Sequence, residues 1–147
     1  MPPVAYFDTS VLLKRYVQEA GSARAQDLLR RYRVLTSAVA TVEATSALVR
    51  RRAAGEIAAA DFAAIVRQLA RDRQRWNLVE ATLDVLDRAE AVIVEVGART
   101  LDAIHLASAL AVQATSAGRD RRLPFITGDG RQRTAAQRLG LQVTWVD

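Results

Sequence analysis

The stretch VAYFDTSVLL, residues 4–13, runs from four apolar or aromatic residues directly into an aspartate. The run from Val4 to Phe7 does not alternate with polar residues, which is typical of a strand covered on both faces. Asp8 follows at once, and ligands of open parallel sheets bind beyond the carboxyl ends of the strands. The stretch therefore predicts a buried strand with a carboxylate at its ligand-binding end. Capping of the following helix is the alternative role for Asp8, because aspartate is a favoured N-cap.

The rest of the chain alternates between short apolar runs and longer helical patterns. We expect further strands at 34–37, 78–79, 123–127 and 141–146, the last at a sheet edge, and helices at 10–17, 22–32, 39–52, 58–75, 83–96, 101–115 and 131–139. Short strands separated by helices favour a parallel sheet covered by helices. No internal repeat or linker interrupts the pattern, so we expect one α/β domain over residues 1–147.

Composition excludes several classes of protein. The chain has 147 residues, half of them hydrophobic, which suits a single folded core. It has no cysteine, so it forms neither disulfides nor cysteine-based zinc sites. His105 is its only histidine, which excludes mechanisms that need two histidines from one chain. No apolar run is long enough for a membrane span, and the N-terminus does not resemble a secretory signal, so we expect a cytoplasmic protein without a membrane partner.

The chain is basic, with a formal net charge of +5, and Lys14 is its only lysine. Arginine presents a planar fork that matches phosphate oxygens. Any single arginine cluster is explained as well by solvated helix ends, where cations suit the helix dipole. The excess summed over the whole chain indicates a polyanionic partner.

Three more acids fall at a strand end or on helix turns, and a structural role alone explains Asp129 better than Glu43 or Asp102. Asp129 follows the strand that ends at Thr127, and capping of the next helix is its alternative role. Glu43 lies about 40° from Val39 at about 100° per residue, and thus close to an expected apolar stripe of Val39, Val42 and Val49. Asp102 lies in the first turn of a helix that is apolar almost all round, where the helix dipole stabilises an anion.

Together the four carboxylates need a common explanation. Clustered carboxylates repel one another and raise one another's pKa. A divalent cation among them removes this cost, and a set of ligands made only of oxygen, with room for waters, favours Mg²⁺ or Mn²⁺.

Four segments of the chain resemble the signature segments of PIN-domain nucleases, and among these the VapC-type toxins of toxin–antitoxin pairs. They are YFDTSVLLKRY, SAVATVEATSALVRR, RTLDAIHLASAL and PFITGDGRQRTAAQRLGLQV. The resemblance implies a Rossmann-like three-layer α/β/α sandwich and a metal-dependent endoribonuclease. It also implies a cognate antitoxin as partner and, often, a toxin homodimer. Gly128 and Gly130, on both sides of Asp129, depart from the family's pattern, and Asp120 is a weaker candidate for an acid in this region.

Carried over residue by residue, the resemblance implies an acidic pocket of Asp8, Glu43, Asp102 and Asp129. Mg²⁺ or Mn²⁺ would bind Asp8, Asp102 and Asp129, and Glu43 would orient the attacking water. The hydroxyls of Thr9, Ser10 and Thr127 would support the pocket. His105 is expected to lie in the core or behind the pocket and not to act as a base.

Two alternatives remain beside the nuclease. Haloacid-dehalogenase-type phosphatases also place an aspartate after their first strand, but they usually have a second aspartate two residues on, where this chain has Ser10. The other alternative is a catalytically inactive PIN module that binds RNA or protein, against which the intact set of four acids argues.

Overall fold

The computed structural model describes residues 2–115 and 123–147, and its centre is a sheet in which every neighbouring pair of strands is parallel. The strand order is β3-β2-β1-β4-β5, for β1 (Val4–Phe7), β2 (Arg33–Ser37), β3 (Asn77–Val79), β4 (Pro124–Thr127) and β5 (Gln142–Trp145). The strand predicted from the opening stretch is therefore central, and β5 is the predicted edge strand. The weaker candidate Asp120 lies outside the described residues.

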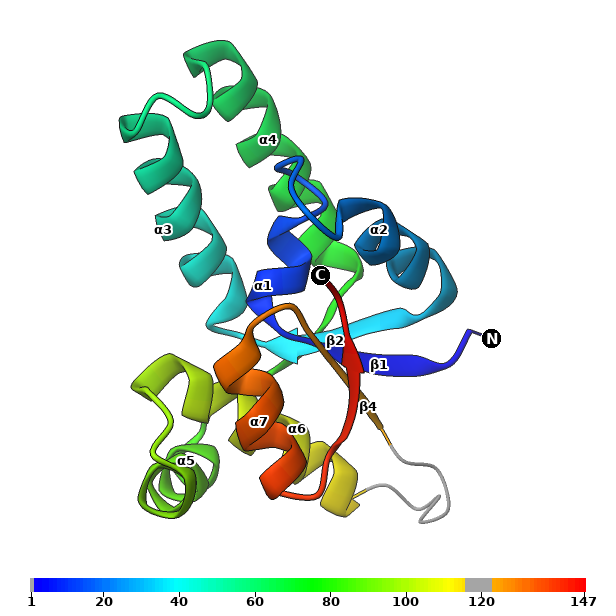
Figure 1. Ribbon diagram of the computed structural model, residues 1–147, viewed down its shortest axis with the longest axis vertical. Coiled ribbons are helices and arrows are strands. Elements are labelled where there is room, and N and C mark those ends of the chain that lie inside the picture. The colour runs from blue at the N-terminus through cyan, green and yellow to red at the C-terminus, as the bar shows by residue number, and fades with distance from the viewer. Residues whose placement is uncertain (1, 116–122) are drawn as a thin grey trace.

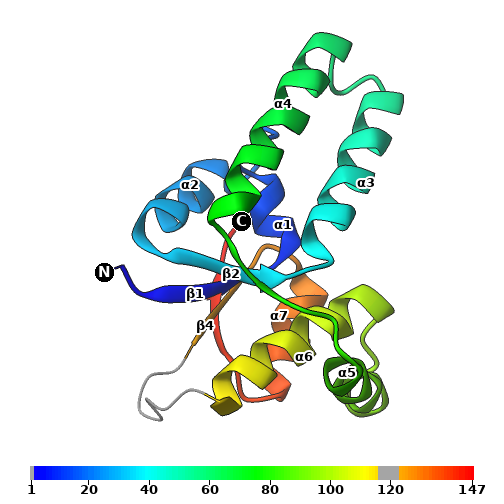
Figure 2. The same ribbon diagram turned by 180° about the vertical axis from the view of Figure 1, so that it is seen from behind.

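Helices cover both faces of the sheet, which confirms the predicted three-layer α/β/α sandwich. Figure 1 shows α1 and α2 on one face, with α3 and α4 extending from that side as a hairpin, and α5, α6 and α7 on the other face. Figure 2 shows the same layers from behind. The helices are α1 (Thr9–Leu13), α2 (Ser22–Arg31), α3 (Ala40–Ala53), α4 (Ala59–Asp72), α5 (Leu83–Val96), α6 (Thr100–Thr115) and α7 (Gly130–Arg138), and a short 3₁₀ turn, η1 (Arg73–Arg75), follows α4.

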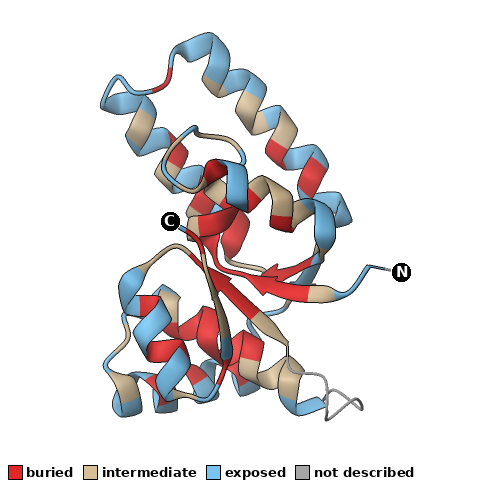
Figure 3. Ribbon diagram, turned by 45° about the vertical axis from the view of Figure 1, so that its right-hand side comes forward, coloured by how far each residue is buried: buried red, intermediate tan, exposed pale blue. Residues whose placement is uncertain are grey.

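The central strand β1 contributes to a core on each side of the sheet. Ala5 and Phe7 pack in the cluster under α1 and α2, whereas Tyr6 packs in the cluster under α5, α6 and α7. The Tyr6 ring stacks on Phe125 of β4, with ring centroids 5.3 Å apart. Figure 3 shows the central strands β1, β2 and β4 as largely buried. Burial on both faces explains why the sequence of β1 is continuously apolar.

The buried face of α3 differs from the predicted stripe of valines. Val42 is 72% exposed and Val49 is 40% exposed. The chain instead buries another face of this helix, which packs against α1 and α4. That face consists of Ala40, Thr41, Ala44 and Leu48.

Two predicted helices end earlier than expected, and their ends meet at a buried carboxylate. The helix expected over 10–17 ends at Leu13, and that expected over 58–75 ends at Asp72 before η1. Asp72 is only 7% exposed and accepts hydrogen bonds from Arg15 (2.7 Å), Tyr16 (2.6 Å) and Gln68 (2.8 Å). The turn after α1 thus brings Arg15 and Tyr16 onto the end of α4.

The most apolar helix, α6, lies under the sheet and is buried without interruption from Ala103 to Ala109. This agrees with the prediction from its sequence. Among the described residues, no helix combines the length and the apolar character that crossing a membrane requires.

Candidate active site

Asp8 stands at the carboxyl end of β1 and is held there by hydrogen bonds of its backbone and its side chain. Its backbone N–H donates to the carbonyl of Ile126 in β4 (2.9 Å). Its Oδ1 accepts from the Thr9 N–H (3.0 Å), and its Oδ2 accepts from the hydroxyls of Ser10 (3.0 Å) and Thr127 (2.8 Å). Asp8 is the N-cap of α1, so the capping role and a place in the site coexist.

Asp129 is fixed as the N-cap of α7, although glycines flank it. Its Oδ1 accepts from the Gln132 N–H (3.0 Å), and its own N–H donates to the Thr127 hydroxyl (3.1 Å). Gly128 is needed because a Cβ there would lie 2.9 Å from Lys14 Cε and 2.9 Å from the Val146 carbonyl oxygen. A Cβ on Gly130 would meet nothing within 4 Å. The departure at residue 128 therefore has a packing cause.

Glu43 and Asp102 reach the same region from helices on opposite faces of the sheet. Glu43 lies in the first turn of α3 and is half-buried. Asp102 lies in the first turn of α6, and its carboxylate is 3.4 Å from Nε of Arg99. The side chain of Gln132 donates to the Asp102 carbonyl (3.0 Å), which ties α6 to α7.

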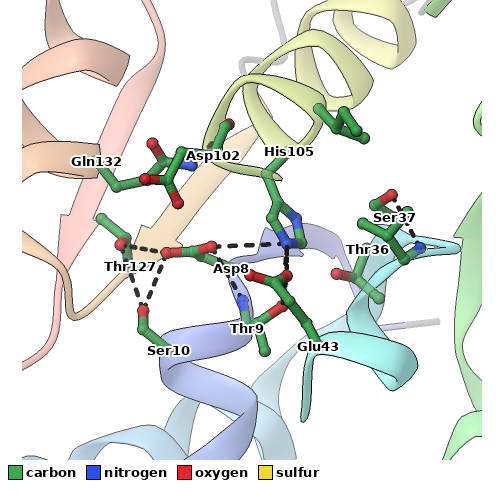
Figure 4. Close-up of polar contacts among 12 residues, drawn as sticks. Asp8, Thr9, Ser10, Thr36, Ser37, Glu43, Asp102, His105, Thr127 and Gln132 are labelled. Carbon is green, nitrogen blue, oxygen red and sulfur yellow. Dashed lines mark hydrogen bonds and ion pairs between the residues drawn. The ribbon is translucent and has the colours of Figure 1, made fainter. Parts of the chain in front are cut away.

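All four predicted acids line one pocket of about 200 Å³, here called the acid pocket. Figure 4 shows Asp8 between Asp102 on one side and Glu43 on the other, with Thr127 and Ser10 beside it. The predicted supporting residues Thr9 and Ser10 also line the pocket, and Thr127 contacts it through Asp8. The remaining lining residues are Leu13, Ala47, Arg50 and Arg99.

Burial and mutual repulsion raise the pKa of two of these acids. Burial raises the pKa of Asp8, although His105 and the hydroxyls of Thr127 and Ser10 act in the opposite direction. Burial also raises the pKa of Asp102, the negative charge of Asp8 adds to this, and the Arg99 guanidinium opposes it. The metal-free pocket therefore holds its negative charge at a free-energy cost.

The pKa of Glu43 shifts in the opposite direction, downward, because Glu43 contacts the buried His105. Burial acts to raise the pKa of Glu43, but the hydrogen bond from His105, its charge and the Thr9 hydroxyl outweigh burial and lower it. Burial likewise acts to lower the pKa of His105, and its hydrogen bond to Glu43 and the nearby charge of Asp8 outweigh this and raise it. Glu43 is thus the acid that the protein keeps ionised by a contact of its own.

Two larger hollows adjoin the acid pocket, one on each side. The first, of about 450 Å³, shares Arg99 and Asp102 with it and is also lined by Arg131 and Arg138 of α7. The second, of about 490 Å³, shares Leu13, Ala47 and Arg50 with it and continues along α3. A chain of negatively charged groups could therefore be contacted by arginines on both sides of the four acids.

Residues 5–136 match the family model of the PIN domain. The chain belongs to the PIN-domain family. PIN domains are generally nucleases and typically use divalent metal ions. The fold is similar to that of a chain in a toxin–antitoxin complex from Klebsiella pneumoniae, with a TM-score of 0.57, 18% identity, and coverage of 85% of this chain and 86% of that chain. A search of curated proteins finds no match.

The acids of this PIN domain fit a hydrated divalent ion better than a fully enclosed one. Within residues 2–115 and 123–147, no three acidic or histidine side chains already converge as a ready set of metal ligands. The four carboxylates nevertheless line one small pocket, and Arg50 and Arg99 lie at its edge. Mg²⁺ commonly binds through one or two carboxylates and keeps several waters, which agrees with this arrangement.

The sequence pattern did not reveal three residues at the PIN site. Arg50 and Arg99 line the acid pocket, and neither was among the predicted site residues. Tyr6 contacts His105 across 99 positions of the chain, so no local periodicity connects them. In the sequence, the one hint of this contact is the position of Tyr6, one residue before the end of the strand that leads into Asp8.

Proposed function

We propose that this PIN domain is a metal-dependent endoribonuclease. The observation that carries the proposal is that four carboxylates from four separate segments of the chain line one pocket, and that this pocket adjoins arginine-lined hollows on both sides. Carboxylates so arranged repel one another unless a cation joins them, and arginines beside them suit a phosphate-containing substrate.

Asp8, Asp102 and Asp129 are the residues that would hold Mg²⁺ or Mn²⁺. When bound, the ion would polarise the phosphate, lower the pKa of a water and stabilise the charge of the leaving oxygen. The raised pKa values of Asp8 and Asp102 support this assignment, since a cation is what would stabilise both as carboxylates.

The protein's own groups account for the remaining steps. Glu43, which stays ionised, would accept a hydrogen bond from the attacking water and orient it. The water would lose a proton to solvent as its oxygen bonds to phosphorus, the bond from phosphorus to the 3′-oxygen would break, and the 3′-oxygen would take up a proton from solvent. The products would carry a 5′-phosphate and a 3′-hydroxyl. Arg50 and Arg99 at the pocket edge would hold the phosphate groups.

The hollows on both sides favour internal cleavage over trimming from an end. A nuclease that acts on chain ends needs contacts on one side of the cleaved bond only, whereas here Arg131 and Arg138 lie on one side and Arg50 on the other. The preference for RNA over DNA rests on the resemblance to VapC-type toxins.

The same resemblance supports the partners in this proposal. The similar solved chain is part of a toxin–antitoxin complex, and we infer that this protein is a cytoplasmic single-domain toxin with a cognate antitoxin and a homodimeric state. Co-expression with the small protein encoded beside it is expected to restore growth, and the two are expected to copurify. Copurification without any rescue of growth would contradict the toxin assignment.

The nuclease is tested with a circular single-stranded RNA, which has no ends and is opened only by internal cleavage. In Mg²⁺ or Mn²⁺ we expect linear products with a 5′-phosphate and a 3′-hydroxyl. D8N and D102N are expected to leave the circle intact, and D61N, which changes an exposed first-turn aspartate of α4, is the matched control that retains cleavage. Opening of the circle by D8N at the wild-type rate would contradict the proposal.

The two alternatives predict other outcomes. A phosphatase of the haloacid dehalogenase type needs Asp8 as a nucleophile, but Asp8 is only 4% exposed and both of its oxygens accept hydrogen bonds. Trapping of a phospho-aspartate would support this class. An inactive PIN module would bind RNA without opening the circle and without binding Mn²⁺.

A further inference from the structure

Behind the acid pocket, a tyrosine and the only histidine of the chain form a buried pair. Tyr6 and His105 are both 0% exposed. The Tyr6 hydroxyl oxygen lies 2.7 Å from His105 Nδ1, and the two rings meet edge to face with centroids 5.8 Å apart. The Tyr6 ring is itself fixed by stacking on Phe125. The imidazole therefore has one orientation, set by residues of the sheet.

The other nitrogen of His105 faces the pocket. Its Nε2 lies 2.7 Å from Oε1 of Glu43, 3.0 Å from the Thr9 hydroxyl oxygen and 3.9 Å from Oδ1 of Asp8. Figure 4 shows the imidazole pointing between Asp8 and Glu43. At 2.7 Å from a carboxylate oxygen, Nε2 must carry a hydrogen, because two lone pairs at that distance would repel.

Both hydrogen bonds to Glu43 end on the same oxygen. Oε1 accepts from His105 Nε2 and, at 2.7 Å, from the Thr9 hydroxyl. Among the described residues, none donates to Oε2. One oxygen of Glu43 is thus anchored in the protein interior, and the second remains available to the pocket that Glu43 lines.

We propose that Tyr6 and His105 are positioning residues that hold Glu43 with one oxygen anchored and the other directed to the attacking water. The Tyr6 hydroxyl occupies Nδ1 and fixes the ring, so that Nε2 is the nitrogen that faces Glu43 and donates to it. The catalytic consequence rests on the proposed nuclease function, whereas the protonation of Nε2 does not. These hydrogen bonds connect Tyr6 in β1 through His105 in α6 to Glu43 in α3, and they join both faces of the sheet at the acid pocket.

The protonation of Nε2 is measured by ¹⁵N NMR of the imidazole. Because His105 is the only histidine, its two ring nitrogens give the only imidazole signals of the protein. We expect a proton on Nε2 in the wild type at neutral pH. A bare Nε2 with a proton on Nδ1 alone would overturn the inference, whatever the protein cleaves.

The positioning role is measured by the kinetics of the Tyr6→Phe variant on the circular RNA. This change keeps the ring stack and removes only the hydroxyl, and we expect kcat to fall about tenfold with KM within about twofold. Tyr16→Phe is the matched control, since it removes a hydroxyl that donates to Asp72 (2.6 Å), which is not in the acid pocket. An unchanged kcat in Tyr6→Phe, or an equal fall in Tyr16→Phe, would overturn the positioning role.

A second pair of variants distinguishes a positioning role of His105 from a packing role. His105→Gln supplies an amide N–H that can donate to Glu43, whereas His105→Leu fills the space without a hydrogen-bond donor. His105→Gln is expected to retain about tenfold more of kcat than His105→Leu. Equal activity of the two variants, both folded by circular dichroism, would show that the imidazole only fills space.

Discussion

The Thr127 hydroxyl donates a 2.8 Å hydrogen bond to Oδ2 of Asp8 and joins the carboxyl ends of β4 and β1. The same hydroxyl oxygen accepts from the backbone N–H of Asp129 at 3.1 Å. One buried side chain thus sets the relative positions of two of the proposed metal ligands.

Replacing Thr127 by valine is expected to lower the free energy of unfolding by about 1–3 kcal/mol, because it removes the donor to a buried carboxylate and leaves the Asp129 N–H without its partner. RNA cleavage should fall with it. Thr127→Ser keeps the hydroxyl and is expected to retain most of both properties. Chemical denaturation and the circular-RNA assay measure the two effects, and equal behaviour of the serine and valine variants would argue against the hydrogen bond.

The glycines around Asp129 give a matched pair of variants. Gly128→Ala places a Cβ at 2.9 Å from Lys14 Cε and from the Val146 carbonyl oxygen, so the turn that carries Asp129 must shift. Gly130→Ala meets nothing within 4 Å and lies in α7, where alanine favours the helix. We expect only Gly128→Ala to weaken Mn²⁺ binding, measured by titration calorimetry. Equal binding by both variants would show that Asp129 is not a metal ligand or that the turn tolerates the change.

Without metal, the acid pocket is expected to lower stability. The pKa of Asp102 is raised by burial and by the charge of Asp8, so its ionisation in the folded protein is disfavoured and stability decreases as pH rises through that pKa. Asp102→Asn removes a repulsion of about 1 kcal/mol and is expected to raise the melting temperature in EDTA at pH 7 by about 2–4 °C. Asp61→Asn, in the first turn of α4, serves as the control and should give no increase. A lower melting temperature for Asp102→Asn would mean that its interaction with the helix dipole or with Arg99 dominates.

The lowered pKa of Asp72 predicts that the protein loses stability in acid. Burial acts to raise its pKa, but its contacts with Arg15, Tyr16 and Gln68 outweigh this and lower it below its usual value of 3.8. A lowered pKa stabilises the fold above the usual value, and this contribution is lost as pH falls through the folded-state pKa. We expect Asp72→Asn to cost about 1–3 kcal/mol at pH 7, with the difference from wild type shrinking below about pH 4.

Urea unfolding at several pH values measures this difference. The exposed Asp87 in α5 provides the control, and Asp87→Asn is expected to change stability by less than about 0.5 kcal/mol. A difference for Asp72→Asn that stays constant down to pH 2.5 would contradict the lowered pKa.

Much of the fold was predictable from local sequence because β1 is a continuous apolar run and because α3, α5 and α7 end close to Gly55, Gly97 and Gly140. The places of Asp8 and Asp129 followed from the rule that ligands gather beyond the ends of parallel strands. The buried face of α3 was not predictable, since the helix packs another face against α1 and α4 and leaves Val42 exposed. Asp72 stands between Arg71 and Arg73 in the sequence, and its buried contacts needed the structure because its partner Tyr16 lies 56 positions away in the chain. The pairing of Tyr6 with His105 spans 99 positions and likewise needed the structure.

Metal-dependent RNA cleavage is tested most directly by the rate at which the purified protein opens circular RNA while divalent metal is removed and then restored. We expect the rate to fall to background in excess EDTA and to return when Mn²⁺ is added beyond the chelator. D8N should remain at background in both conditions, because the pocket then lacks its central carboxylate. Undiminished opening of the circle by the wild type in excess EDTA would contradict the metal-dependent mechanism.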